Sequence, residues 1–232
     1  MASSMVVDEQ DKRLIEVYDL NGRLEGARER LLRDKQIHPE NKEKILQFTE
    51  YLKSEGRNVP TQLKYLVRLT KLALMLNKEF SKCNRNDVKD VVEAIKSKPD
   101  WSENTKEGYK IALKVFFPWL RGCDDEEDEE PEETRWTKIQ SVESRPIDRN
   151  DLLTEEDVNK ILEYAKSNPR DLAMIESLDE AGERAGELLT AGVGDVVLDE
   201  LGAIVYARAK RKKTRNQKIR GRSFLAYGSR TC

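Results

Sequence analysis

The chain is poor in the residues that hold metals and disulfides. Its 232 residues include one histidine, His38, and three scattered cysteines without a CxxC spacing, Cys83, Cys123 and Cys232. Zinc sites and disulfide frameworks need closely spaced sets of such residues, so the sequence predicts neither. Unpaired cysteines in this number fit a reducing cytoplasm.

Long apolar runs are also missing. No stretch of about 18 apolar residues could form a membrane helix, and the N-terminus lacks the apolar segment of a signal peptide. Hydrophobic residues make up 38% of the chain and charged residues 37%, which suits small helical domains better than one large globule. The composition therefore predicts a soluble cytoplasmic protein with no membrane partner.

The net charge of −2 conceals three segments of strong charge. Residues 35–122 carry 18 Lys and Arg against 11 Asp and Glu. Nine of the ten residues from Asp124 to Glu133 are acidic, and nine of the fifteen from Arg208 to Arg222 are basic. Because these segments cancel in the sum, the overall isoelectric point says little about partners.

Helical periodicity organises the first half of the chain. Residues 1–34 are predicted as a charged N-terminal extension with a short, partly mobile helix. Four amphipathic patterns with short connections then predict a compact helical bundle over 35–122. They cover 37–56, 59–77, 86–95 and 102–122, and Pro39, Asn86 and Thr105 are predicted at helix starts.

The second half has a different pattern. The acidic run repels itself and buries no apolar surface, so residues 123–150 are predicted as a linker. Residues 151–232 then predict an α+β unit, whose first helix has a capping-box signature in Thr154 and Asp157. A second helix follows Asn168, and alternating residues from 196 to 220 predict a strand, a turn, a strand, a basic hairpin tip and a strand.

Basic residues recur at helical spacing in the predicted bundle. Lys64, Arg68 and Lys71 share one helix face by their intervals of four and three. A second row recurs at intervals of four and comprises Lys106, Lys110 and Lys114. A single lysine row is most often a solvated surface, but two rows and a basic hairpin tip favour neutralisation of DNA phosphates.

Three residues of the second unit are candidates for chemistry. Arg184 and Glu187 lie three apart in "GERAGELL", so a helical turn would bring them together. A guanidinium suits bidentate binding of phosphate, although an Arg–Glu pair at this spacing is usually a surface salt bridge. Lys210 stands where a strand meets the predicted hairpin, a position from which it could project into a cleft.

The order of these motifs resembles the tyrosine recombinase (phage integrase) family, most of all its archaeal members. The resemblance rests on the basic bundle, then "LTEEDVNKILEYA", then "GxRxxELL", then "VxDVxLDxxGAIV", and finally a lysine-bearing hairpin that ends in "KKTR". It spans roughly residues 35–220. It implies a mainly α fold, in which a SAM-like four-helix core-binding domain precedes a partial α+β catalytic domain of helices and a small antiparallel sheet.

The resemblance also implies roles for residues. Arg184 matches the arginine that holds the scissile phosphate, Glu187 the acidic residue that supports the site, and Lys210 the hairpin lysine that protonates the leaving 5′ oxygen. The family cleaves duplex DNA by attack of a tyrosine hydroxyl on phosphorus, so no metal or other cofactor is expected. Further phosphate contacts are expected from Arg211, Lys212, Lys213 and Arg215.

The sequence departs from the family pattern after the hairpin. The His-x-x-Arg motif, a second His or Trp and the nucleophilic tyrosine have no counterpart, since Tyr227 follows Lys210 by only 17 residues. Glu183 and Ala209 also differ from the family preference. The sequence therefore predicts a recombinase truncated within its catalytic domain and inactive alone, which binds DNA in the nucleoid. It leaves open a non-catalytic regulator or decoy that associates with itself or with a full-length integrase, and a decayed fragment.

Overall fold

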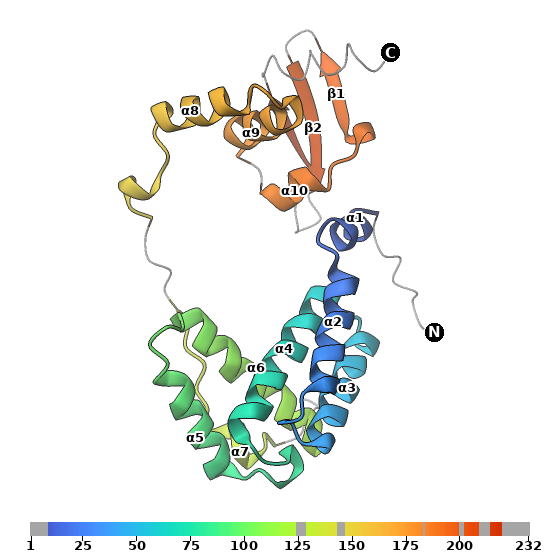
Figure 1. Ribbon diagram of the computed structural model, residues 1–232, viewed down its shortest axis with the longest axis vertical. Helices are drawn as coiled ribbons and strands as arrows, with labels where there is room; N and C mark the ends of the chain where they lie inside the picture. Colours follow the sequence, from blue (N-terminus) through green and yellow to red (C-terminus); the bar gives the residue numbers. More distant parts are fainter. Residues whose placement is uncertain are drawn as a thin grey trace. The chain divides into compact units, whose positions relative to one another are not determined.

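The computed structural model divides into two compact units (Figure 1). The helical unit comprises residues Asp19–Ser144, and the sheet unit comprises Met1–Tyr18 together with Arg145–Cys232. The residues that the structure describes are 9–123, 129–142, 147–182, 184–199, 202–208 and 214–219. Along these residues, no helix is long and apolar enough to cross a membrane.

The helical unit is built from α-helices joined by short loops. Its described elements are α2 (Leu20–Arg33), α3 (Pro39–Ser54), α4 (Val59–Leu76), the 3-10 helix η1 (Phe80–Lys82), α5 (Arg85–Lys96), α6 (Glu103–Arg121) and α7 (Glu132–Arg135). Helix α3 begins at Pro39, as the sequence predicts. Helices α5 and α6 begin after Asn84 and Ser102, two and three residues before the predicted caps, because these side chains accept hydrogen bonds from the first-turn amides.

One continuous apolar core holds these helices together. Phe48, Phe80 and Phe116 are fully buried and lie edge to face, with 5.3 Å between the ring centroids of Phe48 and Phe116 and 4.9 Å between those of Phe80 and Phe116. Such pairs add to the gain from burial itself. The buried Asn41 side chain joins the α4–η1 loop to α3, because it donates to the Lys78 carbonyl at 2.8 Å and accepts from the Phe80 amide at 2.7 Å.

Helix α2 belongs to this core. The sequence predicts residues 1–34 as an extension, but Leu24, Ala27 and Leu31 are buried against α3 and α4. The break in the N-terminal segment falls instead at Asp19, whose backbone is left-handed (φ 44°) and whose carboxylate accepts from the Gly22 amide at 3.3 Å. Helix α1 (Glu9–Val17), which precedes this break, is part of the sheet unit.

Part of the predicted acidic linker also packs on the helical unit. Residues 129–142 include α7, which lies against α5 and α6, and both Thr134 and Thr137 are buried. Glu133 accepts from Arg121 Nε at 2.9 Å, and Arg121 also donates to the carbonyls of Ser81 and Cys83. Arg85 of α5 and Arg121 of α6 thus pair with glutamates of residues 129–142, a segment predicted to be detached because its own acidic residues repel one another.

The sheet unit combines helices with a small antiparallel sheet. After α1, its described elements are the 3-10 helix η2 (Arg149–Asp151), α8 (Glu155–Ala165), α9 (Pro169–Ala181), α10 (Ala185–Leu189), the 3-10 helix η3 (Val193–Asp195), β1 (Val196–Asp199), β2 (Gly202–Arg208) and β3 (Thr214–Ile219). The predicted capping box is present, since the Thr154 and Asp157 side chains each accept from the other's backbone amide. The described strands run in the order β1-β2-β3, with Val196 opposite Val205 and Ala207 opposite Arg215.

The chain is therefore mainly α with a small antiparallel sheet, but its two units are packed unequally. Among the described residues, the apolar core of the helical unit has 22 buried members, whereas Ala165 and Val205 are the buried apolar residues of the sheet unit. Several apolar side chains of that unit face solvent, including Leu153 and Tyr164, the latter 91% exposed. Among the described residues, burial of apolar surface, the main stabilising contribution, is thus concentrated in the helical unit.

Candidate nucleic-acid interface

The outer side of α4 carries three cations. Lys64 and Lys71 are exposed and Arg68 is half-buried, and in the described part of the chain none of the three pairs with a carboxylate. Their spacing places them on the side of α4 opposite the buried Leu66, Leu69 and Ala73. Side chains in this arrangement can meet an anionic partner without first breaking an internal ion pair.

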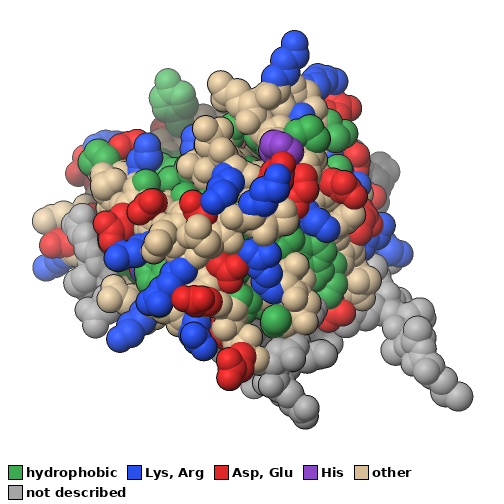
Figure 2. All heavy atoms as spheres, turned by 90° about the horizontal axis from the view of Figure 1, so that it is seen from below, with side chains coloured by type: hydrophobic (Ala, Val, Ile, Leu, Met, Phe, Trp, Pro, Cys, Tyr) green, Lys and Arg blue, Asp and Glu red, His purple; other side chains and the backbone are tan. Residues whose placement is uncertain are grey.

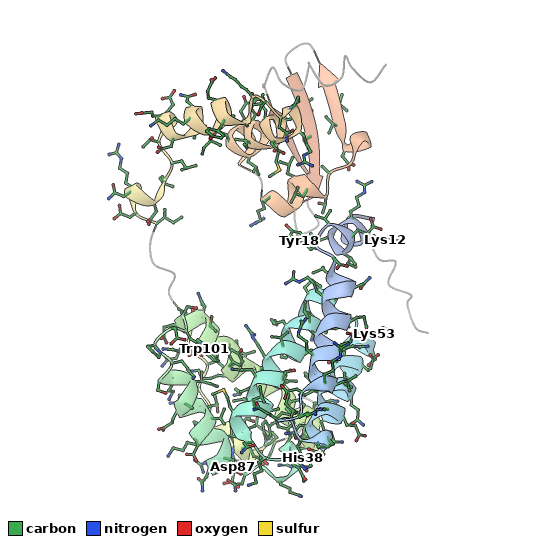
Figure 3. The ribbon with its side chains drawn as sticks, viewed as in Figure 1. Lys12, Tyr18, His38, Lys53, Asp87 and Trp101 are labelled. Carbon is green, nitrogen blue, oxygen red and sulfur yellow. The ribbon has the colours of Figure 1, made fainter. Side chains whose placement is uncertain are left out.

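Aromatic rings lie beside these cations. The Arg68 guanidinium carbon is 5.9 Å from the ring centroid of Tyr109 on α6, and the Tyr109 ring stacks on Trp101 at 4.5 Å and an interplanar angle of 18°. Trp101 lies in the loop before α6 (Figure 3). Lys64 Nζ is 5.1 Å from the Tyr65 centroid, and burial, with a smaller contribution from Arg68, lowers the pKa of Lys64. The interface therefore combines cations with partly buried rings.

A glycine permits this contact between α4 and α6. A Cβ atom on Gly108 would lie 2.3 Å from Arg68 Nη2, so any larger residue there would displace the guanidinium. The same environment acts on Tyr109, because burial raises the pKa of its hydroxyl. Arg68 is thus held along the surface of α6 by its surroundings.

The second predicted row, on α6, is not a free cationic row. Lys106 pairs with Glu103 at 2.8 Å, and Lys114 pairs with Glu130 of the acidic segment at 2.9 Å. Lys110 is only 5% exposed, forms an ion pair with Glu107 and donates to the Lys138 carbonyl at 3.3 Å. Lys110, which the sequence predicts to contact DNA, is thus enclosed by residues 129–142 and its own helix.

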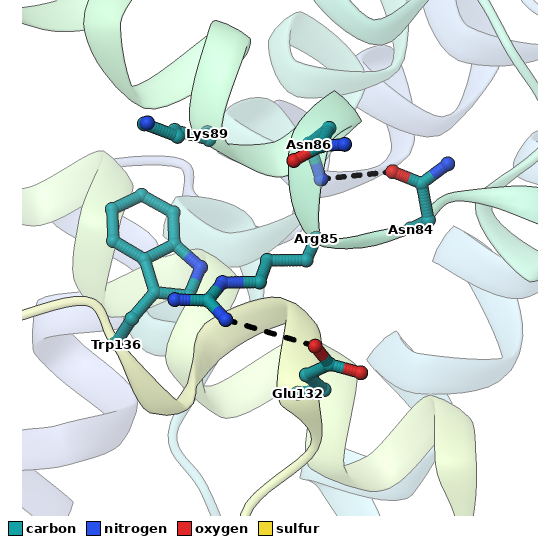
Figure 4. A pocket seen from close by; sticks show the side chains of 6 residues that line it. All are labelled: Asn84, Arg85, Asn86, Lys89, Glu132 and Trp136. Atoms are coloured by element: carbon teal, nitrogen blue, oxygen red, sulfur yellow. Dashed lines mark hydrogen bonds and ion pairs between the residues drawn. The ribbon is translucent and has the colours of Figure 1, made fainter.

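A cavity of about 500 Å³ lies where α7 meets the start of α5 (Figure 4). Its lining residues are Asn84, Arg85, Asn86, Lys89, Glu132 and Trp136. Arg85 Nη1 lies 3.7 Å from Glu132 Oε1, and Trp136 Nε1 donates to the Glu133 carbonyl at 2.8 Å.

Basic and acidic side chains are interleaved on the face that Figure 2 shows, so this face carries no extended patch of one sign.

Arg184 and Glu187 lie together in the sheet unit. Arg184 precedes α10, and its Nη1 donates to Glu187 Oε1 at 2.9 Å while its backbone amide approaches Glu187 Oε2 at 3.4 Å. The Arg184 side chain is 74% exposed, whereas Glu187 is largely covered. The carboxylate thus holds one edge of the guanidinium and leaves the remaining donors open to solvent.

Most of the other predicted site residues of this unit lie outside the described residues. Lys210, Arg211, Lys212 and Lys213 lie outside the described residues, as do Glu183, Ala209 and Tyr227. Arg215 lies in β3, opposite Ala207 of β2, and its side chain is not described.

Among the described side chains, no group of His, Cys, Asp and Glu is arranged to hold a metal ion. Burial raises the pKa of the Cys83 thiol to about 11, which makes it a poor nucleophile.

Sequence reasoning missed the aromatic pair and α2. The stacking of Trp101 on Tyr109 brings together residues from a loop and a helix, and the spacing of Arg68 and Tyr109 in sequence gives no sign that they meet. The many charges of α2 favour a mobile segment, although the helix is packed in the core. Its regular Leu20, Leu24, Ala27 and Leu31 spacing is the signal that could have identified a packed helix.

The chain was compared with known proteins by sequence and by structure, and only the comparison of structures found matches. No family model and no curated protein matches the chain. The XerH site-specific recombinase bound to difH substrate, in a pre-cleavage complex, has a TM-score of 0.55 and 15% identity, covering 98% of this chain and 70% of that chain. Its post-cleavage complex with palindromic difH substrate has a TM-score of 0.54 and 14% identity over the same shares of both chains.

The XerA recombinase is a weaker match. It is 22% identical, with a TM-score of 0.35, over 81% of this chain and 62% of that chain, so this chain spans less than two thirds of the XerA length. The XerH comparisons match nearly all of this chain, including both units. The chain has the tyrosine recombinase fold.

Proposed function

We propose that this chain binds duplex DNA as a protein of site-specific recombination, and that the outer side of α4 supplies the main contact. The observation that carries the proposal is the set of unpaired cations Lys64, Arg68 and Lys71, set beside the Tyr109–Trp101 stack in a protein with the tyrosine recombinase fold. The XerH structures of this fold are bound to difH substrate. Double-stranded DNA is the partner that this comparison and the charge pattern jointly favour.

The physical basis of binding is release of counterions. The logarithm of the association constant K falls linearly with the logarithm of the salt concentration. Each phosphate that a lysine or arginine neutralises makes this slope more negative by about 0.9, so three such contacts contribute roughly −3. The half-buried ring of Tyr109 beside Arg68 adds contact with sugars. Lys106 can join this surface if its pairing with Glu103 is exchanged for a phosphate.

Arg184 is proposed as a residue that holds the scissile phosphate. Its exposed guanidinium, oriented by Glu187, has donors available for the two oxygens of a phosphodiester. Lys210 is proposed as the general acid, and Arg211, Lys212, Lys213 and Arg215 as contacts to the backbone. Binding of DNA without cleavage is proposed for the residues of this chain, in the cytoplasm at the nucleoid.

The second candidate is a non-catalytic regulator that occupies recombination sites or associates with a full-length integrase. The observation that favours it is the location of the main proposed DNA contacts, since Lys64, Arg68 and Lys71 lie in the unit whose described residues form the large apolar core. A suicide substrate with a nicked duplex tests whether this chain cleaves DNA. A covalent protein–DNA adduct would assign strand cleavage to this chain and contradict both candidates, because neither includes cleavage by this chain alone.

The test of DNA binding is a comparison of matched variants. Binding of labelled duplex DNA should be measured by fluorescence anisotropy at several salt concentrations. The triple variant K64Q/R68Q/K71Q should bind 10-fold or more weakly, and its slope of log K against log salt should be less negative by about 2 to 3. The control K53Q/K96Q/K98Q removes the same charge from exposed sites on α3, α5 and the following loop. Equal losses in both variants would show that net charge alone acts, and binding that is independent of salt would contradict the proposal.

A further inference from the structure

A groove of about 350 Å³ runs between α2 and α4, on the side of α4 next to Lys64 and Lys71. It is lined by the cap and one face of α2 and by two apolar residues of α4, namely Asp19, Gly22, Arg23, Gly26, Arg30, Leu63 and Val67. No role in DNA binding follows from the periodicity of the predicted bundle for any of them. The groove is a feature of the packing of α2 on α4.

The floor of this groove is formed by backbone and apolar groups. Gly22 and Gly26 are one turn apart on α2 and present no side chain, but the Asp19 carboxylate covers Gly22, where an added Cβ would clash with Asp19 Oδ2. A Cβ on Gly26 would meet only Arg30 Nη1, at 3.5 Å, so there is open space above the helix backbone. Val67 is 46% exposed at the opposite wall. An extended polymer backbone can therefore approach α2 closely at Gly26, with its apolar parts against Leu63 and Val67.

The arginines of α2 divide into two kinds by the face they occupy. Away from the groove, Arg28 pairs with Glu25 and Glu50, and Arg33 pairs with Glu29 at 2.9 Å. Arg23 and Arg30 line the groove, and within the described residues neither is paired with a carboxylate. The one acidic group of the lining, Asp19, lies at the N-terminal end of α2, where its carboxylate accepts from the Gly22 amide.

The unpaired cations form two rows, one along each side of the groove. Arg23 and Arg30 are seven residues apart on α2, and Lys64 and Lys71 are seven apart on α4. Seven residues correspond to two helical turns, or roughly 10 Å. The walls therefore match a linear polyanion with apolar units between its charges, which is the chemistry of a sugar–phosphate backbone.

We propose that the α2–α4 groove binds one phosphodiester strand of duplex DNA, in which Arg23 and Arg30 contact phosphates on one side while Lys64 and Lys71 contact them on the other. The proposal rests on the proposed function and extends the interface to a helix outside the predicted four-helix bundle. An acidic protein segment is the competing occupant, and it is disfavoured because the shallow glycine floor offers no pocket for side chains.

The experiment compares arginines of the same helix. Arg30 and Arg33 both lie in the last turn of α2, so replacement of either by Gln affects the helix dipole alike. By anisotropy with duplex DNA, R30Q should weaken binding several-fold and make the salt slope less negative by about 0.9. R23Q/R30Q should make the slope less negative by about 1.8, whereas R33Q should leave the affinity and the slope unchanged. G26L should fill the groove and weaken binding at least as much as R30Q, while G26A should bind like the wild type.

Each alternative outcome has a distinct meaning. If K64Q/R68Q/K71Q lowers affinity but R23Q/R30Q and G26L do not, the groove proposal is overturned and the proposed function stands. If the wild-type chain does not bind duplex DNA, both fail. If R23Q/R30Q leaves the DNA slope unchanged but abolishes binding of a labelled polyglutamate peptide, the groove belongs to an acidic protein partner. Thermal melts by circular dichroism verify that G26L and R23Q/R30Q remain folded.

Discussion

Arg13 Nη1 lies 3.0 Å from Asp195 Oδ2, although 182 residues separate the two in sequence. Arg13 also approaches the Thr190 carbonyl, at 3.3 Å, and Asp195 accepts from the Gly192 amide at 2.8 Å. Helix α1 is thereby joined to the turn that follows α10. Since Arg184 directly precedes α10, the N-terminal helix contributes to the stability of the segment that carries the proposed phosphate-binding residue.

Replacement of Arg13 should loosen this turn. We expect R13Q to cost about 0.5–1 kcal/mol, because the pair is partly exposed, and to increase amide hydrogen exchange over residues 185–195. G192A should act similarly, since its Cβ would lie 2.5 Å from Arg13 Nη1 and would displace the guanidinium. The control K12Q removes the same charge from an exposed neighbour on α1, and an equal effect of K12Q would show that the pair itself contributes nothing.

The Lys78–Asp87 pair should make the helical unit sensitive to acid. Lys78 Nζ donates to Asp87 Oδ2 at 2.7 Å and the Asn84 amide donates to the same oxygen at 2.8 Å, and these bonds lower the pKa of Asp87 from its ordinary value of 3.8. A lowered folded-state pKa gives stability that is fully present above the unfolded value and is lost as the pH falls through the folded value.

D87N should therefore be less stable than the wild type at pH 7 and lose less stability below pH 4. Urea midpoints at pH 7 and at pH 3 measure this difference. D90N, which alters a carboxylate of α5 outside the pair, should keep the pH dependence of the wild type. A parallel loss in D87N and wild-type midpoints would show that other carboxylates dominate the acid response.

Lys110 should prove to be a structural residue. K110M leaves the Glu107 carboxylate buried without its ammonium partner, and breaking a buried pair in this way costs about 3–5 kcal/mol. The double variant K110M/E107M should recover most of that stability and bind DNA with an affinity close to the wild-type value. If the double variant folds but fails to bind DNA, the lysine contributes to binding beyond its structural role.

The structure bears out the sequence where helices have two distinct faces. Val88, Val91, Val92 and Ile95 of α5 are all buried, as their spacing predicts. Helix α4 has apolar residues around most of its circumference, so periodicity locates its inner face poorly: Val67 is exposed, while Leu69 and Leu72 are buried. The direction of an almost uniformly apolar helix is decided by its neighbours, which one sequence does not reveal.

Charged residues were predicted less well, for a related reason. Regular spacing correctly places Lys106, Lys110 and Lys114 along one side of α6, but it does not tell which segment covers that side. Glu130 and the Lys138 carbonyl come from a segment that the sequence predicts as a linker. The pairing of Arg184 with Glu187, by contrast, needs only one helical turn, and the spacing of three was sufficient to predict it.

Replacement of Arg184 should leave DNA affinity almost unchanged. The proposed binding surface lies in the helical unit, whereas Arg184 lies in the sheet unit and contacts a single phosphate in the proposed complex. We expect R184Q to bind duplex DNA within about threefold of the wild type and to lower the salt slope by at most about 0.9. R170Q, at an exposed site of α9, is the matched control, and loss of all binding in R184Q would place the main affinity in the sheet unit.

The two units should differ in resistance to proteases. Cleavage requires local opening, and the sheet unit has few buried apolar residues among those described, with Leu152, Leu153 and Tyr164 exposed to chymotrypsin. We expect first cuts near these residues and a persistent fragment that contains 19–142, which mass spectrometry would identify. Because that fragment retains Arg23, Arg30 and the cations of α4, it should bind duplex DNA with nearly the full salt slope. Simultaneous digestion of both units would show instead that the helical unit depends on the sheet unit for its stability.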